Sequence, residues 1–185
     1  MKKILFYALA AAAACMGAAC TDDDAKTTWE EYADWREANI AWLEQLHSRT
    51  NEDGTPFYEV VTPSWYSGAY VLVHRFGEPN TDNLKPLSTS TIDVIYQGFN
   101  YQGERFDSSL TQTAYGRPGV ARFALNGVID GWTAAFETMH VGDSAEIICP
   151  YNMAYGETYM SSLIQPYSAL RFNVRLVDIY AYEKK

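Results

Sequence analysis

Residues 29–47 carry large apolar side chains on what would be one face of a helix. These side chains recur every three or four residues, with carboxylates between them: Trp29, Tyr32, Trp35, Trp42, Leu43 and Leu46. This spacing is typical of an amphipathic α-helix, and Thr27 or Thr28 is placed to cap its start. We therefore expect an N-terminal helix within residues 29–50. It is expected to pack on its own domain in a monomer or to hold that domain off a membrane, with a dimer seam as the alternative.

After Gly54 the apolar period changes to the alternation that is typical of half-buried β-strands. Six segments are rich in Val, Ile, Tyr and Phe and are separated by turn residues: Phe57–Val61, Ala69–Arg75, Thr91–Tyr96, Arg122–Leu125, Ala145–Pro150 and Leu170–Ile179. Between them, Val128–Met139 returns to helical spacing. Short strands in series with one short helix predict an α+β fold, with a mostly antiparallel sheet in one domain over residues 55–182.

The first twenty residues have the pattern of a secretory signal peptide. Lys2 and Lys3 precede an apolar run that is shorter than the ~20 residues needed to cross a membrane, and small residues then lead to Cys20. A cysteine directly after small residues resembles the bacterial lipobox, in which that cysteine is acylated. Cys20 fits this resemblance better than Cys15, because an acidic run that must stay in water follows it.

These features predict a lipoprotein signal peptide at 1–19 and a lipidated tether at 20–28. They place the protein in the cell envelope, anchored through lipid to the outer membrane. The acidic run at 22–24 resembles the surface-export tag of some Gram-negative lipoproteins, and a solvated spacer explains it equally well. Surface exposure is therefore left open.

Charge and cysteine content bear on the expected partners and on the expected disulfides. The chain of 185 residues has 14 Lys and Arg against 23 Asp and Glu, a net charge of −9. Without a basic stripe to neutralise phosphates, nucleic acid is not an expected partner. Cys149 stands alone once Cys15 leaves with the signal peptide and Cys20 carries lipid, so no internal disulfide is expected.

The usual catalytic constellations are missing from the sequence. His47, His74 and His140 are far apart and belong to no metal-ligand spacing. No Gly-rich phosphate loop and no Gly-x-Ser-x-Gly elbow occur. We therefore expect neither a metal nor a cofactor.

Aromatic residues beside turn glycines form a series of motifs in the second half of the chain. In order they are Tyr96-Gln97-Gly98, Gly103 to Ser109, Val128 to Trp132, Val141-Gly142 and Ala154-Tyr155-Gly156, followed by a strand with Phe172. Their order and spacing resemble the FK506-binding protein (FKBP) family of peptidyl-prolyl isomerases over about residues 88–180. The resemblance implies an antiparallel sheet curved around one short α-helix.

The resemblance also implies a role for each site residue. Trp132 is expected as the floor beneath a proline ring, with walls formed by Tyr96, Phe106, Val128, Ile129 and Phe172. Asp107 is expected to orient Tyr96, and the hydroxyl of Tyr155 and the N–H of Ile129 to bind the substrate carbonyl. Met153, Ala121 and Gln165 depart from residues common in the family. These departures bear on peptide preference and catalytic efficiency.

The implied function is peptidyl-prolyl cis-trans isomerisation that assists the folding of exported or envelope proteins, with proline-containing polypeptides as clients. An isomerase breaks no bond, which agrees with the missing nucleophile and metal. A non-catalytic FKBP-like module that binds peptides is the alternative, and a structural surface lipoprotein is a third. Whether FK506-like macrolides bind is left open.

Overall fold

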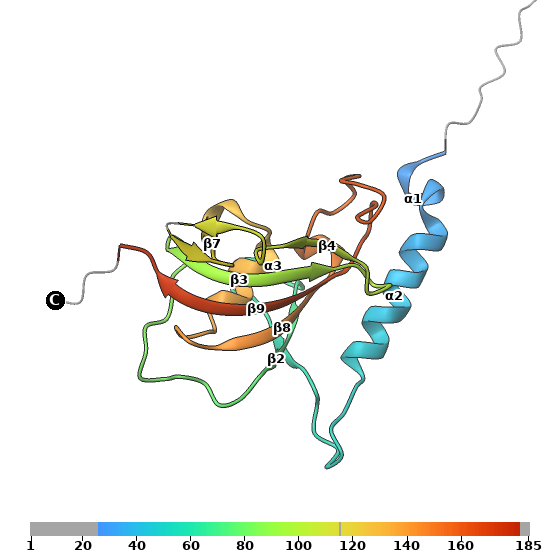
Figure 1. Cartoon of the computed structure of the whole chain (residues 1–185). Helices are drawn as coiled ribbons and strands as arrows, with labels where there is room; N and C mark the ends of the chain where they lie inside the picture. The colour runs from blue at the N-terminus through green and yellow to red at the C-terminus, as the bar shows by residue number, and fades with distance from the viewer. Residues whose placement is uncertain (1–25, 115, 182–185) are drawn as a thin grey trace, which may run out of the picture.

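The computed structural model in Figure 1 describes residues 26–114 and 116–181. The signal peptide predicted at 1–19, the lipidated Cys20 and most of the tether lie outside these residues. Among the helices of the described part, none combines the length and the apolar character needed to cross a bilayer.

The described residues build one large antiparallel sheet. Its strands are β1 (Glu59–Val61), β2 (Val71–Arg75), β3 (Thr91–Phe99), β4 (Arg105–Ser108), β7 (Ala121–Ala124), β8 (Ser144–Cys149) and β9 (Leu170–Ile179). They lie in the order β1-β2-β8-β9-β3-β4, and β7 also pairs with β3. A separate small hairpin consists of β5 (Thr113–Ala114) and β6 (Arg117–Pro118). Figure 1 shows β3 and β9 bowed along their length, and the predicted α+β fold is confirmed.

Helix α3 (Asp130–Phe136) packs on one face of this sheet, and its residues from Gly131 to Phe136 are all buried. Trp132 and Phe136 join Ile147 and Leu176 in the main core cluster. The prediction that this helix begins at Val128 was wrong by two residues. Val128 and Ile129 are extended after the short helix η1 (Leu125–Gly127), as their β-branched side chains favour.

The predicted strands agree with the structure to within two residues, except at β3 and β4. Strand β3 runs on to Phe99, three residues beyond the predicted end at Tyr96. Residues 105–108, which were not among the predicted strands, form β4 and pair with β3 around an irregularity at Gly98 and Phe99. Pairing with β9 on the other side holds Gly98 extended, although glycine has a low strand propensity.

The N-terminal helix is divided in two, α1 (Thr28–Glu31) and α2 (Ala33–His47), at Tyr32, whose φ and ψ are −103° and 24°. Thr27 caps α1 through a capping box with Glu30. Figure 1 shows α2 lying alongside the sheet domain, near the end where β3 and β4 meet.

Helix α2 docks on the face of the sheet opposite α3. Leu72 and Ile148 are paired there, and they alternate with Val73 and Ile147, which point into the main core. Leu72 and Ile148 belong to a second apolar cluster, which we call the outer cluster. It consists of Tyr58, Leu72 and Ile148 and is covered by Trp42, Leu43, Leu46, Phe57 and Tyr70. The expectation that the helix packs on its own domain agrees with these contacts, while the boundaries 29–50 and 55–182 and the monomeric state stay predictions.

The predicted apolar stripe was wrong at the start of the helix. Trp29 is 51% exposed, whereas Arg36 and Asn39 are 6% and 1% exposed. The reason is that this end of α2 faces polar backbone in a loop rather than the apolar outer cluster, so polar side chains are the ones buried.

Asp143 ties the long segment between β2 and β3 to the rest of the domain. Its carboxylate accepts hydrogen bonds from the N–H and the side-chain amide of Asn80 and from the N–H of His140, each at 2.8 Å. The Arg75 guanidinium lies 4.0 Å away. Burial raises the pKa of Asp143, but the hydrogen bonds from Asn80 and His140 outweigh it and hold the pKa below its usual value.

We expect Asp143→Asn to lower the free energy of unfolding at pH 7 by about 1.5–3 kcal/mol, since hydrogen bonds to a buried carboxylate are lost. Because the folded pKa is lowered, this contribution is complete above the unfolded pKa of about 4 and is lost as pH falls through the folded pKa. Urea unfolding at pH 7 and at about pH 3 should therefore show a difference between the two proteins that shrinks at low pH. An equal difference at both pH values would contradict an ionic role.

Candidate active site

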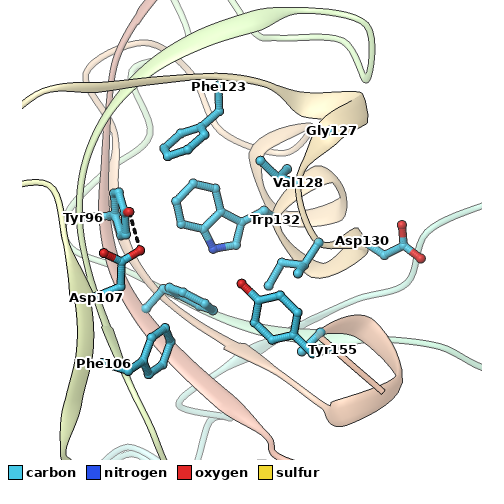
Figure 2. Close-up of a pocket in the computed structure, with 12 residues that line it drawn as sticks. Tyr96, Phe106, Asp107, Phe123, Gly127, Val128, Asp130, Trp132 and Tyr155 are labelled. Carbon is cyan, nitrogen blue, oxygen red and sulfur yellow. Dashed lines mark hydrogen bonds between the residues drawn. The ribbon is translucent and has the colours of Figure 1, made fainter. Parts of the chain in front are cut away.

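An open pocket of about 500 Å³ lies beside the first turn of α3. Its lining consists of Tyr96, Phe106, Asp107, Phe123, Gly127, Val128, Ile129, Asp130, Trp132, Ala154, Tyr155 and Phe172. All eight side chains that the sequence assigns to the site are in this lining. Figure 2 shows Trp132 at the centre, Tyr96 and Asp107 on one side and Tyr155 on the other.

The floor is the buried indole of Trp132, which α3 presents from its first turn. The ring makes edge-to-face contacts with Tyr96, Phe123, Phe136 and Phe172, with centroids 5.1–5.5 Å apart. Such pairs add about 0.5–1.5 kcal/mol each beyond their buried area, so the floor is rigid. Among the described residues no group accepts a hydrogen bond from its buried Nε1–H.

Two walls depend on the absence of a side chain at Gly98. This residue of β3 pairs with Phe172 of β9 and with Asp107 of β4. The rings of Phe106 and Phe172 meet over it edge to face, 5.7 Å apart. A Cβ at Gly98 would lie 2.7 Å from the Phe106 ring and 3.0 Å from the Phe172 ring. Glycine is therefore required for the two aromatic walls to close over the strand.

The polar edge of the pocket centres on Asp107. Its carboxylate accepts a hydrogen bond of 2.6 Å from the hydroxyl of Tyr96 and one of 2.7 Å from the N–H of Ser108. Burial, the hydrogen bond to Asp107 and the charge of Asp107 all raise the pKa of Tyr96. Tyr96 consequently stays protonated and donates to Asp107, and its ring is fixed in the wall (Figure 2).

Two hydrogen-bond donors are available to a ligand. Figure 2 shows the hydroxyl of Tyr155 pointing into the pocket, while the carboxylate of Asp130 points away from it. Burial, and next the charge of Asp107, raise the pKa of Tyr155, so its hydroxyl keeps its proton. In the described part of the chain no group accepts from the N–H of Ile129. The lining thus combines apolar walls with few polar groups, an arrangement that binds an apolar ring next to a carbonyl.

The aromatic wall at Phe123 was missed in the sequence. Its ring lies 5.8 Å from Tyr96 and 5.5 Å from Trp132. The strand predicted at 122–125 contains it, and the alternation of that strand could have placed it on the same face as the predicted site residues. Ala124 is exposed and Leu125 is fully buried in the core, so position 123 is the one that reaches the pocket.

The three departures from the family pattern lie outside the pocket lining. Ala121 and Met153 are buried in the main core. Gln165 lines a separate hollow beside α2, together with Trp35 and Tyr101. None of the three residues is therefore among those that a ligand in the pocket would touch.

The described residues contain no group of three or more neighbouring His, Cys, Asp and Glu side chains that could hold a metal ion. The pocket itself contains the carboxylates of Asp107 and Asp130, and Figure 2 shows them pointing in different directions.

Comparison with known families matches residues 83–177 to the FKBP-type peptidyl-prolyl cis-trans isomerase model. The FKBP-type 22 kDa peptidyl-prolyl cis-trans isomerase of Escherichia coli is 42% identical over 94 residues, which are 51% of this chain and 43% of that protein. The outer membrane protein MIP of Legionella longbeachae is 36% identical over 95 residues, 51% of this chain and 39% of that protein. The matches thus span less than half the length of these relatives.

Solved structures of similar fold cover more of the chain. A peptidyl-prolyl cis-trans isomerase from Pseudomonas syringae superposes with a TM-score of 0.64 at 23% identity, over 80% of this chain and 95% of that one. FkpA from Escherichia coli gives a TM-score of 0.62 at 25% identity, over 82% of this chain and 62% of that one.

We expect Gly98→Ala to displace the Phe106 ring and to lower the free energy of unfolding by about 1–3 kcal/mol, the usual cost of overpacking. Urea unfolding measures the loss, and a crystal structure of the variant shows the ring. Gly127→Ala is the matched control, because Gly127 also lines the pocket and a Cβ there would meet nothing within 4 Å. Equal stability of the two variants would show that the walls do not need glycine at position 98.

Proposed function

The chain belongs to the family of FKBP-type peptidyl-prolyl cis-trans isomerases, and we propose that its pocket catalyses rotation about Xaa-Pro bonds in polypeptides. The observation that carries the proposal is the buried Trp132 indole at the floor of an open pocket with aromatic walls. Its size and apolar lining suit a proline ring, and its donors suit the neighbouring carbonyl.

The chemistry needs no reactive side chain. Rotation about an amide bond is opposed by a resonance barrier of about 18–20 kcal/mol, and unaided isomerisation at proline takes tens to hundreds of seconds. A catalyst must favour the twisted amide over both planar forms. Apolar walls do this by removing water from the planar amide, whose charge separation water stabilises, while the twisted amide has lost that resonance.

Each polar group then has a distinct task. The ring of proline packs on Trp132 beside the wall that Phe106 and Phe172 form, so that the preceding carbonyl lies toward Tyr155 and Ile129. The hydroxyl of Tyr155 and the N–H of Ile129 hold this carbonyl while the other end of the bond turns. Asp107 keeps Tyr96 in place in the wall and puts a negative charge at the edge of the site.

The location of the protein follows from its N-terminal sequence. We propose that Cys20 carries lipid after removal of residues 1–19 and that the domain works at the cell envelope, anchored to the outer membrane. A relative described as an outer membrane protein supports this placement. The clients would be proline-containing exported or envelope proteins, and the apolar walls would also accept an FK506-like macrolide.

Two nearly isosteric variants test the catalytic assignment. Asp107→Asn and Tyr155→Phe should leave the fold intact and lower kcat/KM for an Xaa-Pro peptide by about tenfold, equivalent to about 1.4 kcal/mol of transition-state stabilisation. Tyr159→Phe is the matched control, since Tyr159 is an exposed tyrosine of the same loop. A protease-coupled isomerisation assay gives the rates, and competition with FK506 tests macrolide binding.

The outcomes separate the candidate functions. A wild-type protein that accelerates no Xaa-Pro peptide but binds proline-containing chains is a non-catalytic peptide-binding module. A wild-type protein that shows neither activity nor binding would be a structural surface lipoprotein. If the wild type is active and the Asp107→Asn and Tyr155→Phe variants have the same kcat/KM, the pocket is the site of catalysis but the roles assigned to the two polar side chains are wrong.

The lipid anchor has its own test. Cys20→Ala should abolish incorporation of labelled palmitate and leave the signal peptide uncleaved, because the cysteine is the acylated residue. Cys15→Ala is the control and should be processed like the wild type. Equal labelling of the wild type and Cys20→Ala would remove the anchoring proposal.

A further inference from the structure

The loop that carries Tyr155 lacks strand structure of its own. We call residues 154–169, between the short helix η2 (Tyr151–Met153) and β9, the Tyr155 loop. Near its end Tyr167 has a φ of 66°, a left-handed conformation that a bulky residue rarely adopts without support from its surroundings. Hydrogen bonds within the loop and contacts from elsewhere in the fold together hold it in this shape.

Asn39 of α2 provides the first such contact. Its side-chain oxygen accepts a hydrogen bond of 2.9 Å from the N–H of Ala169, and its amide nitrogen donates one of 2.8 Å to the carbonyl of Trp35. Trp35 in turn donates from Nε1 to the hydroxyl of Ser168 at 2.9 Å. Asn39 is only 1% exposed. A buried amide that accepts from the loop and donates to the helix in this way fixes the end of the loop to the helix.

Arg36 provides the second contact. Its guanidinium lies 3.5 Å from the ring centre of Trp29 and 5.7 Å from that of Tyr167, and it also donates to the carbonyl of Trp29. The rings of Trp29 and Tyr167 meet edge to face at 5.3 Å. The nearest carboxylate, that of Glu37, is exposed and 3.8 Å away. The buried cation is thus stabilised mainly by aromatic faces, one of which belongs to the left-handed residue of the loop.

A single backbone hydrogen bond connects Tyr167, which these contacts hold, to the part of the loop that carries Tyr155. The N–H of Tyr167 donates to the carbonyl of Gly156 at 2.8 Å, and Gly156 follows Tyr155 in the chain. The N–H of Gly156 donates to the carbonyl of Tyr151, whose ring also contacts Tyr167. Position and strain at Tyr167 are therefore linked directly to the backbone that presents the Tyr155 hydroxyl.

We propose that helix α2 is a positioning element of the site, in which Arg36 and Asn39 hold the Tyr155 loop so that the Tyr155 hydroxyl points into the pocket. The helix precedes residues 83–177, which match the family model, so that match alone gives it no role at the site. The inference rests on the proposed function for the role of Tyr155, and extends it to residues that touch no substrate.

A double-mutant cycle on the full chain tests this inference. Asn39→Ala should lower kcat/KM for an Xaa-Pro peptide by about three- to tenfold, and the same change should have little effect in the Tyr155→Phe background. A merely structural effect would reduce the folded fraction and lower activity equally in both backgrounds. Trp35→Phe, which removes only the Nε1–H donor, should act in the same direction. Ile40→Ala, at an exposed position of the same helix, is the control and should change nothing.

Hydrogen exchange gives a readout that does not depend on activity. In Asn39→Ala the Tyr167 amide should exchange at least about tenfold faster, while the amides of β8 keep their protection. Unchanged exchange at Tyr167, or equal losses of activity in both Tyr155 backgrounds, would overturn the inference. If the wild type accelerates no Xaa-Pro bond, the proposed function fails, and the cycle is read from the affinity for a proline-containing peptide, with the same two outcomes.

Discussion

The burial of one indole side chain determines both the fold and the site of this protein. Trp132 projects from the first turn of α3 and touches Tyr96, Phe123 and Phe172, which come from three strands of the sheet. The same contacts that close the core around α3 leave one side of the indole facing the open pocket. Because Trp132 belongs both to the pocket floor and to the main core, moving it would disrupt packing in the whole domain, and the floor is therefore rigid.

The second requirement of the fold and the site is that backbone segments approach one another closely. A Cβ at Gly131 would lie 2.4 Å from the sulfur of Cys149 and 2.9 Å from the carbonyl of Met153, so only glycine lets α3 approach β8 and bring Trp132 into register. Gly98 does the same for the walls. The polar groups then act at the edge of a preformed apolar site, and helix α2 supports the loop that carries Tyr155.

Much of this could be predicted from the sequence, because strand alternation and the order of aromatic and glycine motifs are local signals. Strand β9 was placed at its observed ends, and the predicted site residues lie together. Burial of Arg36 and Asn39 could not be predicted, since it depends on the backbone of a distant loop rather than on the apolar stripe of the helix. Phe123 is a different case, because the alternation of its strand could have placed its ring on the site face, although that strand was predicted without assigning the ring to the pocket.

The most direct test of the central claim is two-dimensional exchange NMR of an Xaa-Pro peptide with a substoichiometric amount of the protein, while the Trp132 indole N–H signal is followed on titration with the peptide. The account predicts exchange peaks between the cis and trans signals of the peptide, together with a shift of the Trp132 signal that saturates with peptide concentration. Exchange no faster than in the free peptide, or catalysis with an unmoved Trp132 signal, would contradict it.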